Sequence, residues 1–137
     1  MTLNHLGFVT RDLEKTVNGY LQMGFVKVHE DVKHHEPKNM YVQRVRLGET
    51  IIEIMQPADS SKPSFAGETL AGSEAPVVLQ HICYDVDDIH KTVNDLMATG
   101  EYTIHEPITS GVFQKNLICF LRNKQLGLIE FFEWPKS

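Results

Sequence analysis

The chain has 137 residues, a formal net charge of −5 and two cysteines, which suits one globular domain. Hydrophobic residues make up 42% and charged residues 23%, and no apolar run approaches the roughly 20 residues of a membrane-spanning helix. We therefore expect neither a membrane protein nor a disordered one. The acidic balance, with no basic cluster beyond Arg44 and Arg46, excludes a nucleic-acid footprint and favours a small-molecule ligand.

The N-terminal residues predict no export signal, because a strand-like segment at 3–9 begins at once and no basic region or cleavage pattern precedes it. Cys83 and Cys119 both lie in apolar, strand-like stretches and form no disulfide framework. The sequence therefore predicts a cytoplasmic protein.

The first half predicts a strand, a helix and three further strands. Asp12 is the expected helix N-cap, and the helix ends at Gly24. The helix face has the apolar spacing of an amphipathic helix, through Leu13, Val17, Tyr20 and Leu21. Strands are expected at residues 3–9, 25–31, 40–47 and 50–56, with a loop or hairpin tip at 33–39.

The second half repeats this order after a stretch rich in Ser, Gly, Ala and Pro, which predicts a linker without periodic structure. Asp88 is the expected N-cap of its helix and Gly100 the residue that ends it. The apolar face consists of Ile89, Val93, Leu96 and Met97. Strands are expected at residues 102–107, 116–122 and 127–133, with a loop or hairpin tip at 109–114.

These two halves are an internal duplication. Residues 3–30 superpose on 79–106 without a gap, and Ile52-Glu53-Ile54 corresponds to Ile129-Glu130-Phe131 with one extra residue in the second copy. We therefore predict a single domain over 1–137, built from module 1 (1–56), a linker (57–77) and module 2 (78–137).

Each half carries one early histidine and one late glutamate inside an apolar strand: His5 and Glu53, then His81 and Glu130. A buried carboxylate costs several kcal/mol unless it is paired, hydrogen-bonded or bound to a cation. If a pseudo-twofold axis relates the modules, two imidazoles and two carboxylates meet, a shell that suits Ni, Co, Zn, Mn or Fe rather than Ca or Mg. The alternative is four core residues that local hydrogen bonds satisfy separately.

Four strings carry a resemblance to a known family: residues 4–9 followed by 12–13, residues 52–57, residues 80–84 followed by 86–89, and residues 127–130. Together and duplicated, they resemble the vicinal oxygen chelate superfamily of glyoxalase I, methylmalonyl-CoA epimerase and extradiol dioxygenases. The resemblance implies an α+β fold in which two tandem βαβββ modules form an open barrel-like sheet around a metal site, the glyoxalase/bleomycin resistance/dioxygenase fold.

The same resemblance implies that His5, Glu53, His81 and Glu130 hold a divalent metal ion (Ni, Co, Zn or Mn), and that one or both of Glu53 and Glu130 also carry a proton. The function it favours is a metal-dependent lyase or isomerase similar to glyoxalase I (lactoylglutathione lyase type). Two alternatives stay open: a methylmalonyl-CoA epimerase, and a non-enzymatic small-molecule or drug-binding resistance protein of the same fold. A dioxygenase is disfavoured, because Fe(II) oxygenases use two histidines and one carboxylate.

Individual residues divide the enzyme interpretations. The string from Glu53 to Pro57 resembles the epimerase. Residues 115–122 contain the Phe-Leu pair of epimerases but lack the Gly-Lys before it and the His-Pro after it that epimerases commonly show. Gln43 also replaces an acidic residue that some epimerases use as a base. The expected partner is a thiol-linked small molecule, a glutathione-type hemithioacetal or an acyl-CoA. Family members are often homodimers, although no apolar stripe here marks an interface.

Other polar residues receive structural interpretations. His29 and His105 are expected at the rim or surface, and Cys83 is expected to be an inert buried thiol. Arg44 and Arg46 share one strand face and either meet a substrate carboxylate or phosphate, or lie in solvent.

Overall fold

The computed structural model describes residues 1–111 and 115–136. Within them the chain forms two compact units, one of which is His5–Gln80. The other combines Met1–Asn4 with the chain from His81 onward. Two strands, β1 (Thr2–Thr10) and β6 (Val77–Asp85), contribute residues to both units.

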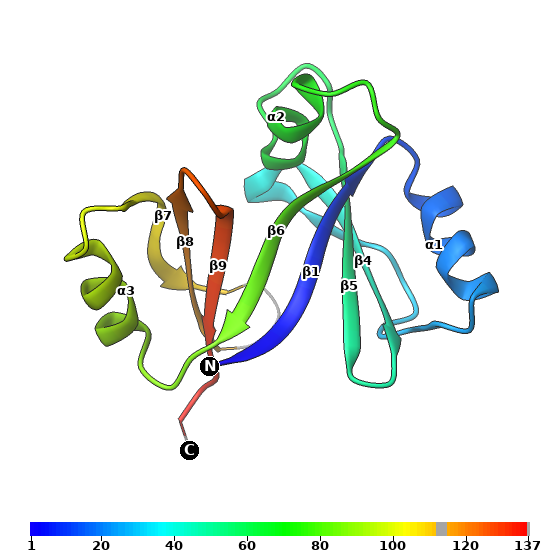
Figure 1. Cartoon of the computed structure of the whole chain (residues 1–137). Helices are drawn as coiled ribbons and strands as arrows, with labels where there is room; N and C mark the ends of the chain where they lie inside the picture. Colours follow the sequence, from blue (N-terminus) through cyan, green and yellow to red (C-terminus); the bar gives the residue numbers. More distant parts are fainter. Residues whose placement is uncertain (112–114, 137) are drawn as a thin grey trace. The chain divides into compact units, whose positions relative to one another are not determined.

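The His5–Gln80 unit contains a sheet whose strands run in the order β2-β4-β5-β1. Strand β1 is parallel to β5, the other pairs are antiparallel, and β3 pairs with β4. After β1 the elements are α1 (Leu13–Gln22), β2 (Val26–Lys27), β3 (Lys33–His35), a 3₁₀ turn (Glu36–Lys38), β4 (Met40–Leu47), β5 (Thr50–Pro57) and α2 (Phe65–Ala71). Figure 1 labels both helices and the strands β1, β4 and β5.

Helix α1 begins where the sequence predicts, because the Asp12 carboxylate accepts a hydrogen bond from the backbone N–H of Lys15 at 3.1 Å. The helix buries Leu13 and Val17 against one face of the sheet. The sheet side of this core is formed by Phe25, Val45, Ile52 and Ile54. Residues that alternate with Ile52 and Ile54 on β5 therefore point to the opposite face.

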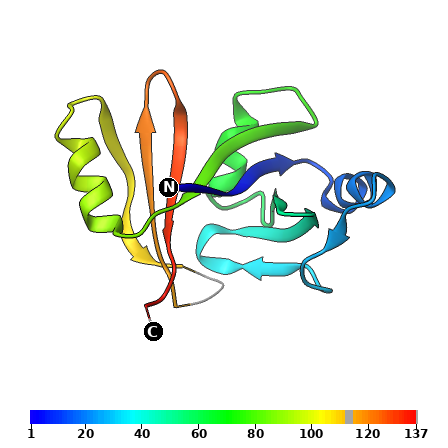
Figure 2. The ribbon, with the colours of Figure 1, turned by 60° about the horizontal axis from the view of Figure 1, so that its bottom comes forward.

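The second unit repeats this plan. After β6 come α3 (Ile89–Met97), β7 (Tyr102–Ser110), β8 (Leu117–Asn123) and β9 (Gly127–Glu133), and the sheet order is β6-β9-β8-β7. Strand β6 is parallel to β9, and the other pairs are antiparallel. Helix α3 lies alongside these strands (Figure 2) and packs through Ile89 and Val93 on Leu121, Ile129 and Phe131.

Each helix is also capped by the end of the last strand in its own module. In module 1, the Gln56 side-chain oxygen accepts from the backbone N–H of Leu13 at 2.6 Å. In module 2, the Glu133 carboxylate accepts from the N–H of Ile89 at 3.0 Å. An otherwise unsatisfied N–H of the first helical turn thus ties the helix to the sheet in both copies.

The α+β class and the duplicated βαβββ order are confirmed. Some details differ from the prediction. Helix α2 lies in the stretch expected to be an unstructured linker, and Ser64 caps it by accepting from the N–H of Gly67 at 3.2 Å. Strand β3 pairs with β4 and occupies part of the segment expected as a loop or hairpin tip at 33–39. The strand expected at 25–31 is only two residues long, as β2.

The segment at 109–114, expected as a loop or hairpin tip, begins with the last two residues of β7, which continues to Ser110, and residues 112–114 lie outside the described residues. None of the helices in the described ranges has the length and apolar character needed to cross a membrane. The boundaries predicted for a single domain and its linker remain predictions.

Candidate metal centre

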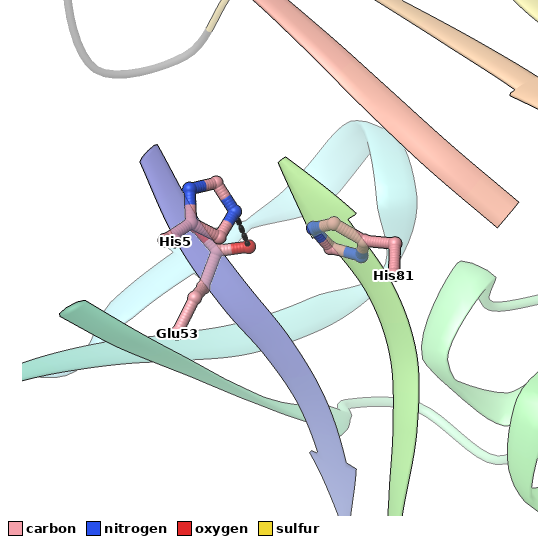
Figure 3. A group of neighbouring side chains, drawn as sticks. All are labelled: His5, Glu53 and His81. Atoms are coloured by element: carbon pink, nitrogen blue, oxygen red, sulfur yellow. Dashed lines mark ion pairs between the residues drawn. The ribbon is translucent and has the colours of Figure 1, made fainter. Parts of the chain in front are cut away.

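His5 is placed by the alternation of β1. Leu6 and Phe8 pack against the core beneath α1, so His5 lies on the opposite face of the sheet, where only 1% of it is exposed. Strand β5 runs parallel to β1 and brings Glu53 opposite Gly7. The His5 Nε2 and Glu53 Oε1 atoms are 3.7 Å apart (Figure 3).

The second oxygen of Glu53 has a different partner. Arg44 is directly opposite Glu53 in the β4–β5 pair, and its Nε and Nη2 atoms donate to Glu53 Oε2 at 2.9 and 2.7 Å. The Arg44 side chain is only 14% exposed. Of the two expectations for this arginine, a solvated face is therefore wrong, and the carboxylate that it meets belongs to the protein itself.

Module 2 contains the equivalent pair within its own unit. Strands β6 and β9 are parallel, and His81 Nε2 lies 3.3 Å from Glu130 Oε1. The His81 side chain is 1% exposed and that of Glu130 is 9% exposed. The residue opposite Glu130 on β8 is Phe120, whose ring meets the His81 ring edge-on at 5.3 Å between centroids.

Both pairs fit the requirements of a metal ligand set. Nitrogen and oxygen ligands bind Zn²⁺ and similar ions at about 2.1 Å, so neighbouring ligand atoms on one ion are roughly 3 to 3.5 Å apart. The 3.7 Å and 3.3 Å separations are close to this value. Each unit therefore supplies a buried imidazole and a buried carboxylate in an arrangement suited to a divalent ion.

The cysteines differ in their surroundings. Cys83 is fully buried, and its Sγ lies within 4.8 Å of a Glu130 carboxylate oxygen. Cys119 donates through its thiol to the backbone oxygen of Glu106 at 3.3 Å. Burial raises the pKa of the Cys119 thiol to about 11, with a smaller contribution from the charge of Glu106. Cys119 is therefore a thiol rather than a thiolate at neutral pH.

Gln43 is not on the face that carries Glu53. It pairs with Ile54 in the sheet register, so its side chain lies on the α1 side, and its Nε2 donates to the backbone oxygen of His29 at 2.7 Å. The residue of β4 on the Glu53 face is Arg44. Gln43 therefore does not occupy the position of a base beside Glu53. The absence of an acidic residue at position 43 is no argument against the epimerase.

Two further histidines, His29 and His105, were expected at the rim or surface. The His29 ring accepts from the backbone N–H of Arg44 at 3.3 Å and contacts the backbone oxygen of Asp31 at 2.8 Å. His105 is exposed, as expected.

The pairing of Arg44 with Glu53 was not predicted from the sequence, although the spacing of the two strands indicates it. The strands expected at 40–47 and 50–56 are separated by Gly48 and Glu49 alone, which indicates a two-residue hairpin. Counting back from that turn pairs Leu47 with Thr50 and Arg44 with Glu53, as the structure has it.

Comparison with known proteins adds the family. Residues 4–120 match the Glyoxalase/Bleomycin resistance protein/Dioxygenase superfamily. The chain belongs to this superfamily. Its duplicated His and Glu pairs lie on the strands of a fold that the superfamily shares.

Within the superfamily, human mitochondrial methylmalonyl-CoA epimerase is 32% identical over 127 residues, which are 91% of this chain and 68% of the relative. Among solved structures, a hypothetical protein from Bacillus halodurans has a TM-score of 0.83 at 16% identity, covering 99% of this chain and 96% of its own. A variant of Streptomyces coelicolor methylmalonyl-CoA epimerase in complex with 2-nitronate-propionyl-CoA has a TM-score of 0.81 at 19% identity, covering 99% of both chains. These two structures confirm the superfamily fold.

Proposed function

We propose that the protein is a metal-dependent epimerase of a 2-substituted acyl-CoA thioester of the methylmalonyl-CoA type. In this proposal His5, Glu53, His81 and Glu130 together hold one divalent ion, and Glu130 carries the proton. The observation that carries the proposal is the repetition of one buried His–Glu pair in each unit of the duplicated fold.

The relatives support the acyl-CoA side of the proposal. The human protein that is 32% identical over 91% of the chain is named as an epimerase of methylmalonyl-CoA. The sequence alone favoured a glyoxalase I-like enzyme, and the comparisons favour the epimerase over it. An acyl-CoA is therefore the preferred thiol-linked substrate.

The chemistry begins with the acidity of the C–H bond next to a thioester. A bound divalent ion supplies stabilisation for the negative charge that develops on the thioester oxygen when that bond is broken. The Glu130 carboxylate accepts the proton and gives it back. Return of the proton from Glu130 to the same face of the carbon regenerates the substrate. Inversion requires a proton on the opposite face, delivered by a second, solvent-exchanging donor.

Burial supports this role for the protein residues. The His81 and Glu130 side chains are 1% and 9% exposed, so little water competes for the proton held by Glu130. The Phe120 ring packs edge-on against the His81 ring and adds an apolar neighbour to the imidazole. The chain thus provides a proton carrier in a water-poor environment at a defined distance from a potential ligand.

A glyoxalase I-like lyase is the second candidate, and the carboxylate pair favours it. Both modules place a glutamate beside their histidine, so no base outside the ligand set is required for proton transfer within a hemithioacetal. Its substrate would be a glutathione-type hemithioacetal rather than an acyl-CoA.

The two candidates are separated by one parallel assay. Metal-reconstituted protein is incubated in deuterated water with one enantiomer of methylmalonyl-CoA and, separately, with the methylglyoxal–glutathione hemithioacetal. Deuterium at C2 together with inversion supports the epimerase, whereas formation of lactoylglutathione supports the lyase.

A third outcome would favour the binding-protein interpretation. If neither substrate turns over, and calorimetry detects ligand binding that is unchanged by a chelator, the catalytic proposal fails. The cytoplasmic location and the homodimer remain predictions. Mitochondrial localisation is part of the name of the human relative, and fractionation of the native protein would test the location.

A further inference from the structure

We infer that Arg44 is a positioning residue that makes Glu53 a one-oxygen metal ligand. The inference rests on the proposed metal site and adds to it a residue that the four-ligand set does not contain. All three groups concerned, His5, Arg44 and Glu53, lie within the His5–Gln80 unit.

The geometry divides the Glu53 carboxylate into two unequal oxygens. Both Arg44 donors converge on Oε2, at 2.9 Å from Nε and 2.7 Å from Nη2. The other oxygen, Oε1, faces the His5 ring nitrogen at 3.7 Å. A carboxylate whose second oxygen is held by charge-assisted hydrogen bonds offers a single oxygen to an ion, and its orientation is set before the ion arrives.

The arginine is itself well anchored. It lies directly across the hairpin from Glu53, and its side chain is only 14% exposed. Its backbone N–H donates to the His29 ring at 3.3 Å, and the other nitrogen of that ring contacts the backbone oxygen of Asp31 at 2.8 Å. The connection from the β2–β3 segment thus supports the strand at the residue that holds Glu53.

Module 2 has a different residue at the equivalent position. Phe120 is opposite Glu130, just as Arg44 is opposite Glu53, and a phenyl ring has no hydrogen-bond donor to hold a carboxylate oxygen. The duplication predicts two equivalent glutamates, but their cross-strand neighbours make them unequal. Glu53 is suited to a fixed ligand role, which leaves the proton-carrying role to Glu130 under the proposed function.

Arg44 has two effects on a bound cation that oppose one another. Its orientation of Glu53 strengthens binding, whereas its positive charge weakens it by repulsion. Lysine keeps the charge but has no planar pair of donors for one oxygen. If positioning dominates, Arg44→Lys and Arg44→Met weaken metal binding alike. If charge dominates, Arg44→Met tightens binding and Arg44→Lys leaves it unchanged.

The test uses Co²⁺ as the probe, because its visible spectrum reports coordination. Affinity is measured by chelator competition for the wild type, Arg44→Lys, Arg44→Met and the control Arg46→Met. Arg46 is exposed and donates to the backbone oxygen of Gly48 at 3.2 Å. We expect both Arg44 variants to bind Co²⁺ about 10- to 100-fold more weakly with an altered absorption band, and the control to match the wild type.

The outcomes separate this inference from the proposed function. If the wild type binds one Co²⁺ per chain and both Arg44 variants keep its affinity and spectrum, the inference is overturned and the metal site stands. If the wild type binds no Co²⁺ at that stoichiometry, the proposed function fails and the inference with it. If Arg44→Met does not fold, Arg44→Lys, which retains a cation beside the carboxylate, decides by the same two measurements.

A double substitution adds a check on the route of the effect. Because Arg44 acts through the Glu53 carboxylate, Arg44→Met should change Co²⁺ affinity far less in a Glu53→Gln background than in the wild type. An undiminished effect in that background would contradict the inference.

Discussion

Substitution of Glu53 by glutamine should destabilise the metal-free protein more than the equivalent substitution of Glu130. Glutamine keeps the shape and one acceptor oxygen but removes the negative charge. In module 1 that charge receives two hydrogen bonds from Arg44, and the arginine side chain, 14% exposed, is left without its counter-charge. Such an uncompensated buried charge is the main reason that breaking a buried ion pair is costly.

The magnitude follows from the two hydrogen bonds. Bonds to charged groups contribute about 1.5–3 kcal/mol and neutral ones about 0.5–1.5 kcal/mol, so their conversion costs about 2 kcal/mol in total. We use the lower end of this difference, because the neutral glutamine also costs less to bury than the carboxylate. With an unfolding entropy of roughly 0.3 kcal/mol/K for a chain of this length, the expected drop in Tm is about 7 °C.

Differential scanning calorimetry in excess EDTA measures this difference without a contribution from bound metal. The matched control is Glu130→Gln, for which Phe120 occupies the position of Arg44, and we expect less than half of the drop. Equal drops for the two variants would refute the reasoning, and so would an unchanged Tm for Glu53→Gln.

Three other predictions concern the site, a cysteine and a helix cap. Glu130→Gln should keep bound metal but lower deuterium exchange into substrate by about 10²- to 10⁴-fold; wild-type exchange rates with full metal content would contradict the base assignment. The raised pKa of Cys119, about 11, makes the native protein bind more protons than the unfolded chain between about pH 8.5 and 11. Urea unfolding should therefore show stability present below this window and falling through it, and Cys119→Ala should flatten that fall. Asp88→Ala removes the acceptor for the Lys91 N–H, 3.0 Å away, and should cost about 1 kcal/mol in the same assay; an unchanged urea midpoint would show that Glu133 alone caps α3.

The elements that sequence predicted well are those with strong local signals. Helices α1 and α3 begin after the aspartates expected as caps, and β9 has the predicted bounds, because an N-cap and a regular hydrophobic period act over a few neighbouring residues. Helix α2 was missed since only Ala66 and Leu70 of it are buried, too few to show a period within a Ser- and Gly-rich stretch.

The candidate site shows the same division. Repetition in the sequence was sufficient to select His5, Glu53, His81 and Glu130, and the structure confirms that each histidine lies beside the glutamate of its own module. The sequence could not predict whether the substrate is an acyl-CoA or a glutathione adduct, because both reactions move a proton next to an oxygen and use the same kinds of side chain.

By itself the sequence determined the duplication, the alternation that buries one His–Glu pair in each module, and the order of strands and helices, since all of these depend on spacing along the chain. The tertiary structure adds that the two modules are chemically unequal, because spacing along the chain can pair Arg44 with Glu53 but does not show that both arginine donors reach one carboxylate oxygen. That inequality depends on which residue faces each glutamate across an antiparallel pair, Arg44 in one module and Phe120 in the other. Strand register brings those side chains together across the sheet, and a carboxylate responds to the neighbour it touches rather than to the neighbour in sequence.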